Sequence, residues 1–223
     1  MGENIQLRSV DGFALGAYRA DPAGDPKGAI VVIQEIFGVN DHIRSVADGY
    51  ARDGYVAIAP QIFDRVERDI ELGYQEKDMG RGIEVAFQKL DHGLALQDVQ
   101  AAVDAAAAHG RVGVVGYCFG GLLTWRAACG LNGISAAVAY YGGGIVGEAD
   151  RPPRCPVMMH FGEKDAHIPI KDVDAIKAAQ RDVRIFVYPA DHGFNCDARG
   201  SYDAESARLA RERTLEFFAE HLG

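Results

Sequence analysis

The hexapeptide G-Y-C-F-G-G at positions 116–121 constrains the fold of this chain more than any other feature of its sequence. It follows the apolar run 112–115 and precedes a helix-like stretch over 122–129. A reactive side chain between glycines at such a junction is typical of a nucleophile elbow, a sharp turn that lifts that side chain above a sheet. The glycines permit the turn because a Cβ would crowd the neighbouring backbone. The sequence therefore predicts a strand–turn–helix unit that presents Cys118.

Strand and helix patterns alternate along the rest of the chain. Residues 4–8 and 13–18, separated by Asp11-Gly12, predict an antiparallel hairpin at the N-terminus. Residues 61–80 predict a loop with a short helix, and 83–109 predict one long helix. The other expected strands are 29–34, 55–59, 112–117, 134–140, 157–161 and 184–188, and the other expected helices are 42–53, 122–129, 168–181 and 202–221. This alternation predicts one α/β domain over residues 1–223, with a mainly parallel sheet and helices on both faces.

The charge, hydropathy and cysteine spacing of the chain exclude several classes of binding partner. The 223 residues carry a net charge of −9, which argues against binding to nucleic acid or to an anionic membrane. We find no apolar segment long enough to cross a bilayer and no signal-peptide pattern, so we expect a cytoplasmic protein. The four cysteines lack any spacing typical of metal ligands, and we expect no metal and no cofactor. A small molecule is the expected partner.

Three chemically active residues each follow a predicted strand. They occur in the order Cys118, Asp165 and His192, and this order of nucleophile, acid and histidine is the one that α/β hydrolases use. A free thiol is only slightly ionised at neutral pH, so Cys118 needs a base such as His192 to become a nucleophile. Asp165 would hold the other ring nitrogen of His192. We expect a catalytic triad at the carboxyl edge of the sheet.

Two other aspartates could take the place of Asp165, and two backbone N–H groups could complete the site. Asp172 and Asp191 are alternatives to Asp165, although the former lies in a predicted helix and the latter adjoins the histidine. An oxyanion formed during acyl transfer needs two donors, for which the backbone N–H groups of Phe119 and Ile36 are suitably placed after two strands.

Glu35 directly follows a predicted buried strand, where an unpaired carboxylate is costly. In one interpretation it bonds to a nearby arginine or to backbone donors. In the other it faces Cys118 across a cleft and adjusts the ionisation of the thiol.

Four segments resemble the dienelactone hydrolase family: Q-E-I-F-G-V-N at 34–40, V-G-Y-C-F-G-G at 115–121, A-D-H-G-F at 190–194 and E-R-T-L-E-F-F at 212–218. The resemblance implies a compact α/β hydrolase, commonly monomeric, that opens a small ester or lactone without a cofactor. It also implies that Glu35 engages the thiol of Cys118 at rest and moves away when an anionic substrate arrives.

The chain departs from the family pattern where an arginine normally follows the catalytic histidine. Asn195-Cys196-Asp197 fills that stretch, and the nearest arginine is Arg199. Arg81 lies close to the place of a second family arginine, and we expect it to bind a substrate carboxylate. Our hypothesis is thus a cysteine-dependent hydrolase of carboxylic esters or lactones. The alternative is a thiol-based redox sensor or binding protein on the same fold.

Overall fold

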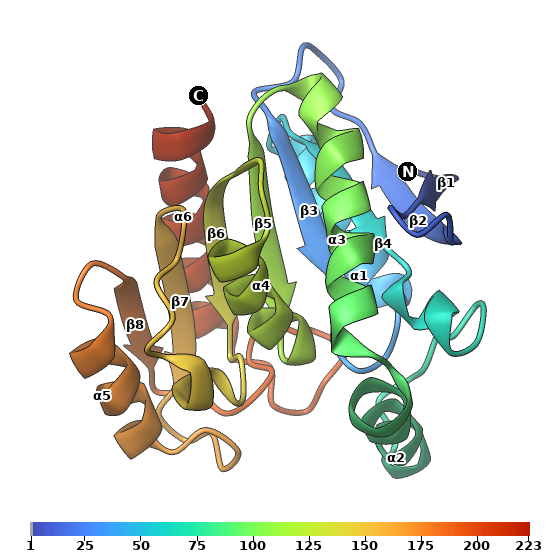
Figure 1. The fold of residues 1–223 in the computed structure, drawn as a ribbon. Coiled ribbons are helices and arrows are strands. Elements are labelled where there is room, and N and C mark those ends of the chain that lie inside the picture. Colours follow the sequence, from blue (N-terminus) through green and yellow to red (C-terminus); the bar gives the residue numbers. More distant parts are fainter. Residues whose placement is uncertain (1) are drawn as a thin grey trace.

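A single sheet forms the centre of the computed structural model, which describes residues 2–223 (Figure 1). Within that range its eight strands have the order β1-β2-β4-β3-β5-β6-β7-β8. β2 is antiparallel to both of its neighbours, and all other neighbouring strands are parallel. The strands are β1 (Glu3–Arg8), β2 (Ala14–Ala20), β3 (Ala29–Ile33), β4 (Val56–Pro60), β5 (Val112–Tyr117), β6 (Ile134–Tyr140), β7 (Val157–Gly162) and β8 (Arg184–Tyr188).

Helices cover both faces of this sheet. α3 and α4 pack on one face, and α1 and α6 lie on the opposite face (Figure 1). The α-helices are α1 (Asp41–Arg52), α2 (Glu76–Ile83), α3 (His92–Ala106), α4 (Phe119–Gly130), α5 (Ile170–Ala179) and α6 (Ala204–Leu222). Shorter segments are η1 (Ile62–Arg65), the π-helical η2 (Glu84–Lys89), η3 (Ala107–His109) and η4 (Ile145–Glu148). The predicted α/β architecture with a mainly parallel sheet is confirmed.

The N-terminal hairpin is also confirmed. Its strands pair with Leu7 opposite Leu15, so that both leucines are buried. The turn closes with a 2.8 Å hydrogen bond from the N–H of Ser9 to the carbonyl of Phe13. Gly12 has a φ of 86°, which glycine adopts without steric cost.

The three central strands β3, β4 and β5 are buried along their entire length. Their apolar sequences predict this, because a parallel strand that is covered by helices on both faces has no polar side. Each fully buried valine or isoleucine contributes about 1.5–3 kcal/mol. The loops at the carboxyl ends of these strands are therefore anchored to a closely packed core.

The prediction of one helix over 83–109 is wrong. Helical structure begins earlier, with α2, and passes into the π-helical η2 before it ends at Leu90, whose backbone is extended. A separate helix, α3, then starts at His92, because Asp91 caps it by accepting the N–H of Leu94 at 3.0 Å. Hydrophobic spacing runs through both helices and so hides the break between them.

No helix in residues 2–223 is long and apolar enough to cross a membrane.

Candidate active site

Cys118 occupies the turn between β5 and α4. Its φ of 56° and ψ of −115° are unusual for a residue with a side chain. A Cβ on Gly116 would lie 2.1 Å from the carbonyl oxygen of Gly120, and a Cβ on Gly120 would lie 2.4 Å from that of Ile33. The elbow thus requires glycine at both positions, and its close packing fixes the backbone of the cysteine.

His192 and Asp165 meet at the same edge of the sheet, on the loops after β8 and β7. The Nδ1 atom of His192 lies 2.7 Å from Oδ2 of Asp165. The other carboxylate oxygen of Asp165 accepts the N–H groups of His167 and Ile168, at 2.8 and 3.1 Å. Asp165 is therefore held in place from both sides, and it leaves Nε2 of the imidazole free for another partner. Neither competing aspartate bonds to the ring: Asp172 lies on α5, and Asp191 accepts the backbone N–H of His192.

The surroundings of His192 strongly favour its protonated form. Burial alone would lower the pKa of the imidazole, but hydrogen bonds with Asp165 and Cys118 raise that pKa to about 10. The contribution of Cys118 to this pKa indicates that the thiol lies close to the imidazole. The arrangement can hold a thiolate beside an imidazolium, which is the reactive form of a cysteine nucleophile.

The backbone N–H groups of Phe119 and Ile36 belong to residues that line the same cavity as Cys118. Phe119 is the first residue of α4, where the N–H groups of a helix have no intrahelical acceptor. Ile36 lies in the turn after β3, and α2 packs so tightly on this turn that a Cβ on Gly82 would lie 2.4 Å from the carbonyl oxygen of Ile36. Among residues 2–223, neither N–H donates to another protein group. Both are free to bind a developing oxyanion.

A cavity of about 330 Å³ opens over the thiol, and we call it the thiol cavity. Its walls are mostly apolar, and Phe87 and Ile83 at its border are unusually exposed for large hydrophobic residues. The lining residues are Ile36, Phe37, Met79, Ile83, Phe87, Cys118, Phe119, Leu122, Gly143, Gly144, His167, His192 and Arg199. This size and lining suit a small, largely apolar molecule.

The arginine that lines the thiol cavity is Arg199, and Arg81 is not among the lining residues. The guanidinium of Arg81 instead pairs with Glu67 and with Glu84, at 2.8 Å from the latter. Arg199 lies beyond the stretch where the family pattern places its arginine, and it reaches the cavity because the loop after His192 folds back.

Glu35 is completely buried and bonds to residues other than the thiol. Its Oε1 lies 3.5 Å from Nη1 of Arg199, and the hydroxyl of Tyr74 donates to its Oε2 at 3.4 Å. This is the arginine-paired arrangement that the sequence left open. An effect of Glu35 on Cys118 remains a prediction, and it would require the side chain to move.

Two further aromatic rings surround the imidazole of His192. The ring of His167 packs edge-on against it, with centroids 5.4 Å apart. Tyr141 carries no motif at all, yet its ring lies 5.1 Å from His192 and its φ is 38°. The only signal for Tyr141 was its position directly after a predicted strand.

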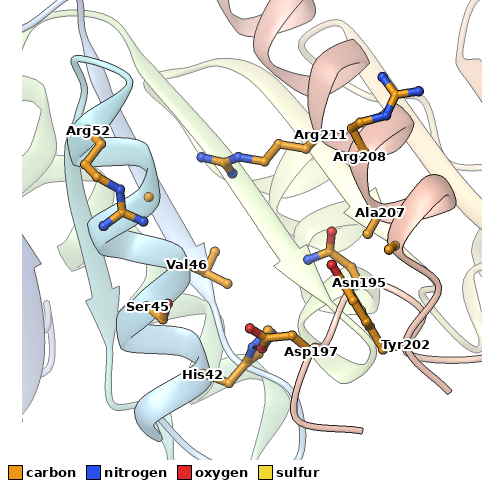
Figure 2. Close-up of a pocket in the computed structure, with 12 residues that line it drawn as sticks. His42, Ser45, Val46, Arg52, Asn195, Asp197, Tyr202, Ala207, Arg208 and Arg211 are labelled. Atoms are coloured by element: carbon orange, nitrogen blue, oxygen red, sulfur yellow. Dashed lines mark hydrogen bonds and ion pairs between the residues drawn. The ribbon is translucent and has the colours of Figure 1, made fainter. Parts of the chain in front are cut away.

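A second hollow, of about 260 Å³, lies between α1, α6 and the loop after His192 (Figure 2). We call it the arginine pocket, because Arg52, Arg208 and Arg211 line it. His42 and Asp197 lie together at one end of this pocket, and Nδ1 of His42 is 3.0 Å from Oδ1 of Asp197. His42 also belongs to a buried group with Glu35 and Cys196, whose potential ligand atoms all lie within 4.8 Å of one another. These three residues could hold a metal ion.

The parallel sheet, the elbow after β5 and the loops that follow β7 and β8 define an α/β hydrolase fold. Residues 15–222 match the model of the dienelactone hydrolase family, and the chain belongs to that family. It is 32% identical to a carboxymethylenebutenolidase of Pseudomonas putida, over 97% of this chain and 96% of that protein. It is 36% identical to a protein of Synechocystis sp. that is provisionally named a carboxymethylenebutenolidase, over 93% of this chain and 92% of that one.

A crystal structure from Klebsiella pneumoniae, provisionally named a dienelactone hydrolase, has the same architecture. It superposes with a TM-score of 0.84 at 33% identity and covers 99% of this chain and 100% of its own. A hydrolase is therefore the class to which this protein belongs, and these relationships do not favour a redox sensor.

Proposed function

We propose that the protein hydrolyses a small ester or lactone through a Cys118–His192–Asp165 triad and a covalent acyl-enzyme. The observation that carries this proposal is the 2.7 Å contact of His192 with Asp165, on an imidazole whose protonation Cys118 also favours. The matching family supports the reaction class. The apolar thiol cavity supports a small substrate.

The first half of the reaction forms a thioester. The thiolate of Cys118 attacks the carbonyl carbon, and the carbonyl oxygen becomes an oxyanion between the N–H groups of Ile36 and Phe119. When this intermediate collapses, the bond from carbon to the ester oxygen breaks. The leaving alkoxide takes the proton of His192. In a lactone the alcohol that forms remains attached to the acyl group.

The second half regenerates the thiolate. His192, now neutral, accepts a proton from water as the water oxygen attacks the thioester carbonyl. The bond from carbon to sulfur then breaks and releases the carboxylic acid. Asp165 keeps the imidazole in the orientation and tautomer that both halves need.

We further propose that the natural substrate carries an acid group, which Arg199 binds. Arg199 is the arginine that lines the thiol cavity, and its present partner is the buried Glu35 at 3.5 Å. A substrate carboxylate would compete with Glu35 for this guanidinium. The names of the relatives agree with such a substrate, because a carboxymethylenebutenolide is a lactone whose carboxymethylene group carries an acid.

The test is to trap the acyl-enzyme. Wild-type protein is mixed with p-nitrophenyl acetate, quenched in acid and digested, and the peptide that contains Cys118 is weighed by mass spectrometry. We expect an added acetyl group on this peptide, and steady turnover of both p-nitrophenyl acetate and dienelactone. Cys118→Ala should show neither, whereas Cys129→Ala, which changes a cysteine inside α4, should behave as wild type. Turnover that persists in Cys118→Ala would remove the nucleophile assignment.

A further inference from the structure

Three buried side chains from distant parts of the chain converge beside the loop that follows His192. They are Glu35 from the turn after β3, His42 from the first turn of α1, and Cys196. Their potential ligand atoms lie within 4.8 Å of one another. None of the three belongs to the Cys118–His192–Asp165 triad, and their sequence spacing matches no metal motif, so the sequence alone predicts no site here.

Two atoms of this cluster lack hydrogen-bond partners within residues 2–223. They are Nε2 of His42 and Oε1 of Glu35, and both are buried. Arg199 lies 3.5 Å from Oε1 without making a hydrogen bond. A buried polar atom without a partner costs about 1–3 kcal/mol. Because the ligand atoms of Glu35, His42 and Cys196 cluster within 4.8 Å, a ligand bound among the three residues could satisfy both of these atoms.

The hydrogen bond of His42 fixes what its free nitrogen can offer. An ionised carboxylate only accepts, so Nδ1 of His42 donates its proton to Asp197, at 3.0 Å. In the neutral ring Nε2 then carries a lone pair that a metal ion can accept. A histidine whose other nitrogen is held by a carboxylate is the usual arrangement of a histidine that binds a metal.

We propose that Glu35, His42 and Cys196 form a binding site for a borderline-soft divalent cation, with zinc as the best fit. Thiolate, imidazole and carboxylate are the three ligand types that zinc takes in proteins. Magnesium and calcium prefer oxygen ligands alone and do not suit this set.

The distances and charges are compatible with that ion. Ligand atoms in a tetrahedral zinc site lie about 3.5 Å apart, given bonds of about 2.0–2.3 Å. The cluster would therefore contract by about 1 Å, which the loop that carries Cys196 can allow. The zinc ion neutralises the carboxylate and the thiolate, whose proton leaves to solvent. The neighbouring charges of Asp197 and Arg199 balance each other.

The arginine pocket gives access from solvent. His42 and Asp197 line one end of it, and the side chain of Asp197 is 71% exposed. Figure 2 shows these two side chains facing each other, away from the arginines at the other end. The bound ion would tie the turn after β3, α1 and the loop after His192 together.

Cobalt(II) is a suitable probe, because a thiolate ligand gives cobalt an intense near-ultraviolet absorption that zinc lacks. Metal-free protein is titrated with cobalt(II), and zinc is then added as a competitor. We expect one equivalent of cobalt, the thiolate absorption band, and loss of the band when zinc displaces the cobalt. The Cys118→Ala variant should behave in the same way, which separates the site from the nucleophilic thiol.

The variants decide the assignment. Cys196→Ala should abolish the band, while Cys155→Ala, which changes another non-catalytic cysteine, should retain it. Asp197→Asn, at an exposed position that does not risk the fold, should weaken cobalt binding about 10–100-fold through its effect on His42. Turnover of p-nitrophenyl acetate verifies that each variant other than Cys118→Ala is folded. The proposal is overturned if the protein binds no cobalt, if the band depends on Cys118, or if binding is unchanged in both Cys196→Ala and Asp197→Asn.

Discussion

Arg199 lines the thiol cavity and His42 lines the arginine pocket, and both residues lie near Glu35. The polar groups of the two regions are nevertheless arranged in opposite ways. On the side of the thiol cavity, Asp165 and His192 form a chain of short hydrogen bonds. Near the arginine pocket, Nε2 of His42 and Oε1 of Glu35 are buried without hydrogen-bond partners. A completed chain fixes one geometry in advance, as catalysis requires. Partnerless atoms leave room for a ligand.

The strongest test of this contrast exchanges one cysteine on each side. Cys118→Ala removes the proposed nucleophile, and kcat/KM for p-nitrophenyl acetate should fall at least about ten-thousandfold. Cys196→Ala should change kcat/KM by less than about threefold, since activity is assigned to the other side. Steady-state kinetics measures both variants. A similar loss of kcat/KM in the two would contradict the assignment of catalysis to the thiol cavity alone.

The next test removes the charge that orients the imidazole. Asp165→Asn should lower kcat about ten-thousandfold, as a wrong tautomer does in related triads. The control is Asp191→Asn, in which the amide oxygen can still accept the backbone N–H of His192. Equal losses in the two variants would mean that the bond between Asp165 and His192 has no special role.

The same variant makes a prediction about pH. Asp165 helps to raise the pKa of His192 to about 10 in the folded protein. A raised pKa contributes stability in full below the unfolded value of about 6.5 and loses it as pH rises through the folded value. The free energy of unfolding of the wild type should therefore exceed that of Asp165→Asn most near about pH 6, and the difference should shrink toward about pH 10. Urea unfolding across this range measures it, and a difference that grows with pH would contradict it.

A smaller effect is expected from the elbow itself. Gly120→Ala should destabilise the fold by about 3 kcal/mol, because the new Cβ would lie 2.4 Å from the carbonyl oxygen of Ile33. Gly80→Ala, on α2, meets nothing within 4 Å and should stabilise the protein by about 0.5–1 kcal/mol. Chemical denaturation of the two variants compares a packed glycine with a free one.

The smallest effect concerns the two arginines. Arg199→Met should raise KM for an ester that bears a carboxylate by about thirtyfold, or about 2 kcal/mol, and leave KM for p-nitrophenyl acetate nearly unchanged. Arg81→Met should alter neither KM, because Arg81 does not line the thiol cavity and pairs with Glu67 and Glu84 instead. If KM for the ester that bears a carboxylate rose in Arg81→Met and not in Arg199→Met, Arg81 would be the residue that binds the carboxylate.

Local patterns explain what the sequence could predict. The elbow, the hairpin and the buried strands each depend on residues close together in the chain, and all three are present. The meeting of Asp165 with His192 was also within reach, since parallel strands bring their following loops to one edge.

Longer-range features could not be predicted. The break between η2 and α3 depends on one capping aspartate within a continuous hydrophobic pattern. That Arg199 lines the thiol cavity, while Arg81 does not, depends on how the irregular loop after His192 folds. The group of Glu35, His42 and Cys196 needs three segments to converge, and no spacing in the sequence records that.

The left-handed backbone of Cys118 has a consequence for how this scaffold can diversify. The packing of the neighbouring glycines fixes that conformation. The position of the reactive atom therefore depends on the backbone of the elbow and not on the atom being sulfur. Another small nucleophile at this position would inherit the same presentation, the same imidazole and the same backbone donors. Descendants of such a protein could exchange the reacting element while the surrounding architecture stays the same.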